Sequence, residues 1–127
     1  MSELALIIED DEDLANIFAE ALRGVGFEVE HVVDGRMGQQ RLKQDPPPYL
    51  ILLDMHLPGV SGEQIHAMLT ERGEAHRVII CSADVKLVER YRSAGVRALT
   101  KPAPMTELQR VVQEVVCQGE LARGSAS

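Results

Sequence analysis

Cysteine is scarce in this chain, which carries only Cys81 and Cys117 among its 127 residues. The two positions have neither the spacing of a metal-thiolate site nor the number needed for a disulfide framework. Both lie within apolar segments, a setting that predicts two buried and chemically inert thiols. Zinc modules and disulfide-stabilised scaffolds are therefore excluded.

Basic residues are also in short supply. The chain has 13 lysines and arginines against 20 aspartates and glutamates, which leaves a formal net charge of −7. Such a domain is poorly suited to direct, nonspecific binding of nucleic acid or of an anionic membrane. The negative charge instead suits the binding of cations. Part of the acidic excess is concentrated in one run of five residues: Glu9, Asp10, Asp11, Glu12 and Asp13.

Long apolar runs are absent, so the sequence has no candidate membrane-spanning segment. Residues 1–4 carry no basic region ahead of the first apolar stretch and do not have the pattern of a signal peptide. We therefore expect a cytoplasmic protein. Its length and its apolar content of 45% are typical of a single globular domain. We assign this domain to residues 1–119 and expect 120–127 to be a flexible C-terminal tail or linker stub.

One short apolar stretch, from Tyr49 to Asp54, organises the rest of the chain. It lies between the prolines of residues 46–48 and the Pro58-Gly59 turn, and it ends on a carboxylate. A run this short predicts a strand buried on both faces. Its terminal aspartate would face the crevice where open α/β sheets bind ligands, although an aspartate there also suits a simple turn cap.

Strand-like and helix-like patterns alternate along the whole chain. Further strands are predicted at residues 4–8, 27–33, 78–81 and 96–100, and helices at 14–22, 35–44, 61–69, 84–94 and 108–116. The alternating pattern of 27–33 is typical of an edge strand, and Ser61 with Gln64 forms a capping-box pattern. This order predicts an α/β protein with a single five-stranded parallel sheet, doubly wound with helices on both faces.

Polar side chains follow four of these strands. Right-handed crossovers bring the carboxyl ends of parallel strands to one edge of the sheet, which makes neighbours of Glu9, Asp10, Asp54, Ser82 and Lys101. Converging carboxylates repel one another unless a cation joins them, and Mg²⁺ accepts carboxylates together with phosphoryl oxygens. With an ammonium and a hydroxyl nearby, the cluster predicts a site for a phosphoryl group carried by Asp54.

Several short motifs follow one another in this sequence: Ile7 to Asp11, Leu52 to Gly62, Ser82-Ala83, Ser93 to Gly95, and Leu99 to Pro102. Their order and spacing resemble the receiver domain of two-component response regulators, over nearly the whole chain. The resemblance implies a flavodoxin-like sheet of strand order 2-1-3-4-5. It also implies a domain that takes a phosphoryl group from a histidine kinase or a histidine phosphotransfer protein and then signals to a partner or output domain.

The resemblance further implies a role for each residue of the cluster. Asp54 would be the phosphoacceptor, and Glu9, Asp10, Asp54 and the backbone carbonyl of His56 would hold Mg²⁺ or Mn²⁺. Ser82 and Lys101 would contact the phosphoryl group, with a cis peptide joining Lys101 to Pro102. We choose Glu9 and Asp10 over Asp10 and Asp11 because the pair in this family follows the strand directly. The only chemistry implied is self-phosphorylation and autodephosphorylation, not a separate enzymatic activity.

Three further positions near the site are expected to modulate it: His56, Ala83 and Asp84. We hypothesise that His56, two residues beyond the acceptor, tunes hydrolysis of the phosphorylated state. The sequence departs from the family at Ala98, where Tyr or Phe is usual, and the segments between Ser82 and Lys101 are slightly short. The other histidines, His31, His66 and His76, are predicted to be surface residues, and Tyr91 to belong to the core.

Other functions compete with this interpretation. The absence of an aromatic residue at Ala98 keeps open a receiver fold that only docks partners, without phosphorylation. A phosphatase of the haloacid dehalogenase class requires a second acid where His56 stands. A flavodoxin-type FMN binder requires a phosphate loop where this chain has an acidic run that would repel phosphate. The sequence leaves the cognate kinase, the output and the oligomeric state open, a homodimer included.

Overall fold

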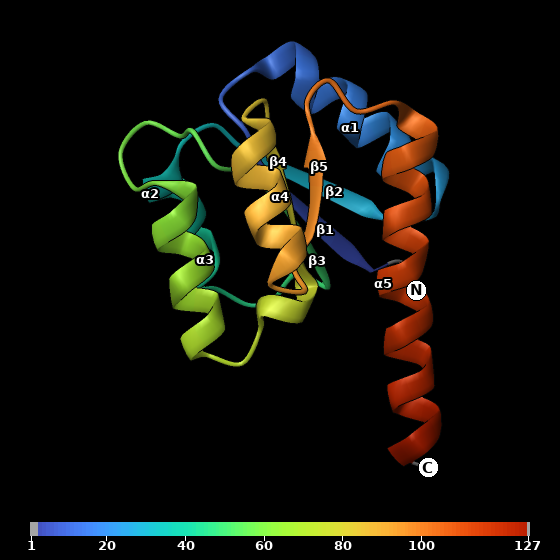
Figure 1. Cartoon of the computed structure of the whole chain (residues 1–127). Helices are drawn as coiled ribbons and strands as arrows, with labels where there is room; N and C mark the ends of the chain where they lie inside the picture. Colours follow the sequence, from blue (N-terminus) through green and yellow to red (C-terminus); the bar gives the residue numbers. More distant parts are fainter. Residues whose placement is uncertain (1–2, 127) are drawn as a thin grey trace.

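The computed structural model describes the backbone of residues 3–126 and the side chains of residues 3–119. Its centre is a five-stranded parallel sheet with the order β2-β1-β3-β4-β5, as predicted, and helices cover both faces (Figure 1). The strands are β1 (Leu4–Ile8), β2 (Glu28–Val32), β3 (Leu50–Asp54), β4 (Val78–Ser82) and β5 (Arg97–Thr100). The helices are α1 (Glu12–Gly24), α2 (Gly35–Arg41), α3 (Gly62–Glu71), α4 (Val85–Ser93) and α5 (Met105–Ala126), with a short 3₁₀ turn, η1 (Ala75–Arg77).

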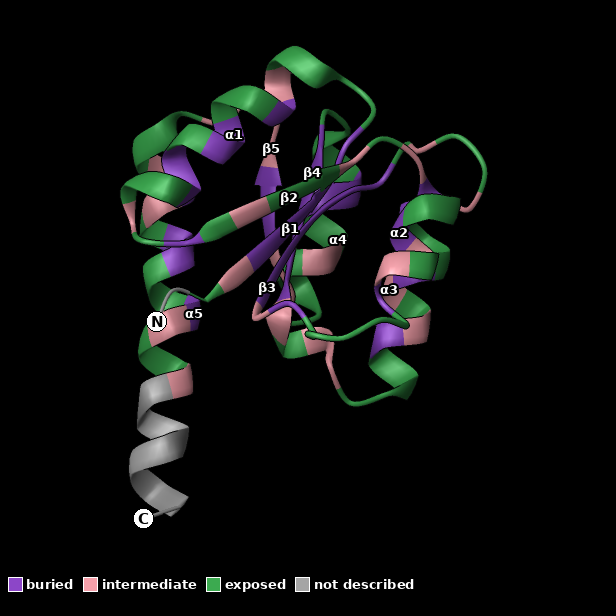
Figure 2. Ribbon diagram, turned by 180° about the vertical axis from the view of Figure 1, so that it is seen from behind, coloured by how far each residue is buried: buried purple, intermediate pink, exposed green. Residues whose placement is uncertain are grey.

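The core consists of two apolar layers, one on each face of the sheet. Helices α1 and α5 supply one layer, in which Phe18 and Leu108 pack against side chains of β1, β3 and β4. Helices α3 and α4 supply the other layer, where Ile65 and Val88 pack against the opposite face. Strands β3 and β4 are buried along their full length (Figure 2), as expected for strands in the middle of a parallel sheet.

Side-chain caps fix where the helices begin. Asp11, Asp34, Ser61 and Asp84 each accept a hydrogen bond from a backbone N–H in the first turn of the helix that follows. At α3 the predicted capping box is present, because Gln64 also accepts from the N–H of Ser61. These caps start α1, α2, α3 and α4 just after strands β1, β2, β3 and β4, so the strand–helix loops gather at one edge of the sheet.

Two details differ from the sequence predictions or extend them, and a third agrees with the resemblance. Cys81 is buried as predicted, but Cys117 is exposed, because the apolar stripe of α5 at Val111, Val112 and Val115 faces the sheet and position 117 lies off that stripe. The peptide between Lys101 and Pro102 is cis, as the resemblance implies, and Asp45-Pro46 is a second cis bond that the sequence did not predict.

Helix α5 continues to Ala126, so the proposed domain boundary at residue 119 remains a prediction. No helix in the described part of the chain is both long and apolar enough to cross a lipid bilayer.

Candidate functional site

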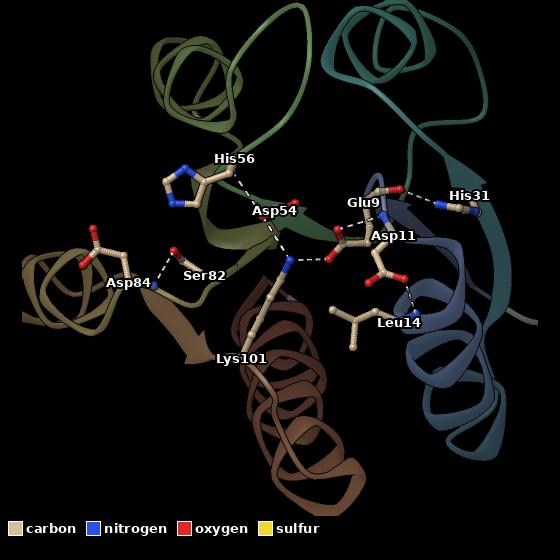
Figure 3. A network of polar contacts seen from close by, with 9 residues as sticks. All are labelled: Glu9, Asp11, Leu14, His31, Asp54, His56, Ser82, Asp84 and Lys101. Carbon is tan, nitrogen blue, oxygen red and sulfur yellow. Dashed lines mark hydrogen bonds and ion pairs between the residues drawn. The ribbon is translucent and has the colours of Figure 1, made fainter.

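Four strands of the sheet deliver polar residues to its carboxyl edge (Figure 3). Glu9 and Asp10 follow β1, Asp54 ends β3, Ser82 ends β4, and Lys101 follows β5. The parallel register pairs Ile8 with Leu53, so Glu9 and Asp54 come from equivalent positions on adjacent strands. This shared register explains why residues distant in the sequence meet here.

Three carboxylates converge at this edge. One carboxylate oxygen from each of Glu9, Asp10 and Asp54 lies within 4.8 Å of the others. Glu9 is only 2% exposed and Asp54 only 4%, whereas Asp10 is open to solvent. Asp11 lies outside this group and caps α1, because its Oδ1 accepts from the N–H of Leu14 at 3.1 Å. The geometry therefore favours the pair Glu9 and Asp10.

The Lys101 ammonium joins two of these acids. Its Nζ lies 2.5 Å from Oε1 of Glu9 and 3.2 Å from Oδ1 of Asp54. Burial raises the pKa of Glu9 to about 7, with Asp54 adding to the rise and Lys101 opposing it. Burial alone would lower the pKa of Lys101, but its pairs with Glu9 and Asp54 hold that pKa above its ordinary value. Lys101 thus keeps its charge and partly neutralises the cluster.

A backbone N–H also contacts the carboxylate of Asp54, at the centre of the cluster. The N–H of His56 donates to Oδ1 of Asp54 at 3.2 Å, which turns the β3–α3 loop around the carboxylate. The His56 side chain is exposed, and its ring extends away from Asp54 (Figure 3). Asp54 is therefore more than the turn cap that its sequence context also allowed, because its carboxylate is buried among an ammonium, an amide and other acids.

The hydroxyl of Ser82 lies at the end of β4. Ser82 is fully buried, and its Oγ accepts a hydrogen bond from the N–H of Asp84 at 3.0 Å. Asp84 then caps α4 by accepting from the N–H of Leu87 at 3.2 Å. Ala83 and Asp84 are exposed on the loop between β4 and α4. Two successive hydrogen bonds therefore connect Ser82 to the first turn of α4.

The family's usual aromatic position is filled by a small side chain. Ala98 is 4% exposed within β5, and its carbonyl accepts a hydrogen bond from Nε of Arg92 at 2.8 Å. The aromatic ring nearest in the sequence, Tyr91, is only half-buried and makes a T-shaped contact with His66 of α3, with ring centroids 5.2 Å apart. His66 is thus a half-buried contact residue of α3 and α4, not the surface residue predicted, because Tyr91 covers it.

One residue of the site was missed by sequence reasoning. His31, assigned to the surface, is exposed on β2, yet its Nε2 lies 2.7 Å from the backbone carbonyl oxygen of Glu9. The register of β1 with β2 pairs His31 with Ile7, which places His31 near Glu9, but no sequence pattern indicated the contact. The third surface histidine, His76, is exposed in η1, as predicted.

The donor set of this cluster suits a hard divalent cation. Mg²⁺ prefers oxygen ligands and binds through one or two carboxylates while retaining water. The described residues offer the carboxylates of Glu9, Asp10 and Asp54 within 4.8 Å of one another. A metal bound there would also relieve the mutual repulsion of these acids.

Comparison with known proteins shows one family. Residues 5–113 match the model of the response regulator receiver domain. The phosphate regulon transcriptional regulatory protein PhoB of Rhizobium meliloti is 33% identical over 115 residues, which cover 87% of this chain and 50% of that protein. The transcriptional regulatory protein QseB of Escherichia coli O157:H7 is 32% identical over 106 residues, covering 81% of this chain and 48% of QseB. The chain spans about half or less of the length of such curated relatives.

Solved structures show the same architecture. The receiver domain of the Francisella response regulator 1452 superposes with a TM-score of 0.80 at 21% identity, over 93% of this chain and 99% of that one. The response regulator DrrB of Thermotoga maritima, an OmpR/PhoB homologue, superposes with a TM-score of 0.76 at 25% identity, over 94% of this chain and 54% of DrrB.

Proposed function

The chain belongs to the response regulator receiver domain family, and from that premise we propose that Asp54 is its phosphoacceptor. The family assignment favours a two-component receiver over the phosphatase and the FMN binder. The observation that carries the proposal is the position of the Asp54 carboxylate, buried at the end of the central strand, within 4.8 Å of Glu9 and Asp10 oxygens and 3.2 Å from the Lys101 ammonium.

Glu9, Asp10, Asp54 and the backbone carbonyl of His56 would hold Mg²⁺ or Mn²⁺. The clustered carboxylates support this assignment, and His56 belongs to the same loop because its N–H already binds Asp54. Such a cation neutralises charge on the phosphoryl oxygens during transfer. Glu9 and Asp54 would then have a second positive partner besides Lys101.

The reaction is the transfer of a phosphoryl group from an imidazole to a carboxylate. An oxygen of Asp54 forms a bond to the phosphorus of a phosphohistidine, and the phosphorus–nitrogen bond breaks with its electron pair returning to the imidazole. The product is an acyl phosphate on Asp54. Because this transition state is loose, positioning and charge neutralisation supply most of the acceleration, and Lys101 is placed to contribute both.

The phosphoryl group would then reorganise the loops around it. It adds roughly two negative charges and three acceptor oxygens, to which the O–H of Ser82 would donate while its Oγ accepts from the N–H of Asp84. Movement of Ser82 toward the phosphoryl group would bias the loop of Ala83 and Asp84 and the start of α4. With Ala98 in β5, this route replaces a swinging aromatic ring as the means of conformational signalling.

A histidine kinase or a histidine phosphotransfer protein would supply the phosphoryl group, in the cytoplasm. Relatives named as transcriptional regulatory proteins are about twice as long as the matched region. This difference supports an output domain or a separate effector protein as the recipient of the signal. The acidic balance of the chain argues against direct nucleic-acid binding by the receiver itself.

Intact-mass measurement after incubation with acetyl phosphate and Mg²⁺ tests the proposal. Wild type should gain the mass of one phosphoryl group, and the gain should disappear in Asp54→Asn and in the presence of EDTA. Asp34→Asn is the matched control, because it makes the same change at a half-buried helix cap outside the acidic cluster and should gain the mass as wild type does. A wild-type protein that gains no mass would instead favour the phosphorylation-independent docking module.

We also propose that the side chain of His56 affects the lifetime of the acyl phosphate. The residue follows Asp54 by two positions and borders the site from the β3–α3 loop. His56→Ala should change the half-life of the phosphorylated protein by a few-fold, as followed by mass. An unchanged half-life leaves His56 with its backbone contact alone.

A further inference from the structure

The side chain of His31 crosses from the edge strand to the metal-binding loop. His31 lies on β2, and its Nε2 is 2.7 Å from the backbone carbonyl oxygen of Glu9 (Figure 3). A carbonyl oxygen can only accept a hydrogen bond, so Nε2 must carry the hydrogen and donate it. The contact spans 22 positions of sequence and is part-buried, so it is not a local turn bond.

The backbone of Glu9 is held on both sides by β2. The N–H of Glu9 donates to the carbonyl oxygen of Val32 at 3.1 Å, one residue beyond the last paired position of the strands, Ile8 with Val32. The carbonyl of Glu9 accepts from His31. The residue that follows β1 is therefore fixed although the strand has ended.

The carbonyl of Glu9 belongs to the peptide group that joins Glu9 to Asp10. Since a peptide group is planar, fixing this oxygen fixes the plane from which the Glu9 and Asp10 side chains diverge. The Glu9 carboxylate points inward to Lys101, while the Asp10 carboxylate is exposed, and both bring an oxygen within 4.8 Å of an Asp54 oxygen. A turn of this plane would move the two acids apart.

We propose that His31 is a positioning residue for the Glu9–Asp10 metal-binding pair, an inference that rests on the proposed metal site. Groups that orient metal ligands typically affect metal affinity by 10- to 100-fold. We expect His31→Ala to raise the dissociation constant for Mn²⁺ by about tenfold. His31→Gln should restore binding, because its terminal amide donates from nearly the same reach as Nε2, whereas His31→Asn, with its shorter side chain, should not.

The experiment measures free Mn²⁺ by electron paramagnetic resonance in titrations of wild type, the three His31 variants and His76→Ala. His76 is the matched control because it is exposed in η1, away from the acidic cluster. Melting temperatures in EDTA check that the variants are folded. A difference in Mn²⁺ affinity between the Gln and Asn variants at equal melting temperatures separates positioning from a loss of stability.

The outcomes separate this inference from the proposed metal site. Weakened Mn²⁺ binding in Ala and Asn with recovery in Gln supports the role of His31. If wild type binds Mn²⁺ and the Ala variant binds it with an affinity within twofold of wild type, the role of His31 is overturned and the metal site stands. The same conclusion follows if the Gln variant binds as weakly as the Ala variant. Wild type that binds no Mn²⁺ overturns the metal site itself and this inference with it.

Discussion

At Glu9, burial and the positive charge of Lys101 act in opposite directions on the pKa. The carboxyl is almost fully removed from water and faces Asp54, both of which favour its protonated form, while the Lys101 ammonium at 2.5 Å favours the ionised form. Burial is the largest of these effects, so the pKa of Glu9 rises to about 7. A carboxyl group with a pKa of about 7 still holds its proton in mildly acidic solution. A metal ion that binds Glu9 must displace that proton.

Metal affinity should therefore depend on pH. Below pH 7 Glu9 is mostly protonated and above it mostly ionised, whereas the raised pKa of Lys101 keeps the ammonium charged throughout. We expect Mn²⁺ to bind roughly tenfold more weakly at pH 6 than at pH 8, because its ligand must first lose a proton. Isothermal titration calorimetry at both pH values measures this ratio. In Glu9→Gln the dependence should flatten, and a wild-type affinity that is equal at the two values would contradict the role of Glu9.

Lys101 has two effects that a substitution can separate. Its ammonium lies on Glu9 and Asp54 and competes with a metal for them, but it also offers positive charge to a transferring phosphoryl group. Lys101→Ala should bind Mn²⁺ at least as tightly as wild type and accept the phosphoryl group from acetyl phosphate about a hundredfold more slowly.

Lys86→Ala provides the control for that experiment, because Lys86 is exposed on α4 and should change neither quantity. Weaker Mn²⁺ binding in Lys101→Ala would show that the ammonium supports the acidic cluster more than it competes with the metal.

At the scale of elements, the junction of β3 with α3 depends on a close approach at Gly62. A Cβ atom there would lie 2.3 Å from the carbonyl oxygen of Asp54 and 2.6 Å from Cα of Met55. Both neighbours are backbone atoms, so they cannot move aside as a side chain could. The absence of a side chain at Gly62 allows α3 to begin directly behind Asp54.

Gly62→Ala should therefore destabilise the fold by about 2–4 kcal/mol, as expected for a substitution that forces a packed backbone apart. Urea denaturation measures the free energy of unfolding. Gly24→Ala is the control, because a Cβ there meets only the flexible end of Gln109, and its effect should stay within about 1 kcal/mol. Equal stabilities for the two variants would contradict the proposed contact.

The sequence predicted elements best where their signals are local. The capping box of Ser61 and Gln64 is present because both partners lie within one helical turn. The prediction that Cys117 is buried was wrong, because an apolar neighbourhood in sequence does not say which helix face a residue occupies. The T-shaped contact of His66 with Tyr91 joins two helices, and no local pattern encodes such a pairing.

At the scale of the whole molecule, sheet topology alone predicted which residues share an edge. Parallel strands joined by right-handed crossovers bring Glu9, Asp54 and Lys101 to one edge of the sheet, independently of their side-chain conformations. The particular contacts were not predictable: whether Lys101 pairs with Glu9 or only with Asp54, and whether His31 reaches the Glu9 carbonyl, depends on side-chain conformations set by packing.

Metal binding should stabilise the whole domain if the acidic cluster exists only in the folded chain. A ligand at a hundredfold excess over its dissociation constant adds about 2.7 kcal/mol to the free energy of unfolding. Thermal unfolding in Mg²⁺ and in EDTA measures this difference. The gain should be lost in Asp10→Asn and kept in Asp13→Asn, and a loss in both variants would point to nonspecific screening of acidic charge.

Chemical mapping of the phosphorylated residue tests the central claim most directly. Borohydride reduces the acyl phosphate of an aspartate to homoserine, which peptide mass spectrometry locates in the sequence. After treatment of wild type with acetyl phosphate and Mg²⁺, homoserine should occur at position 54 and at no other acidic residue. Homoserine at Asp10 or Asp11, or in no peptide at all, would contradict the assignment of Asp54 as the phosphoacceptor.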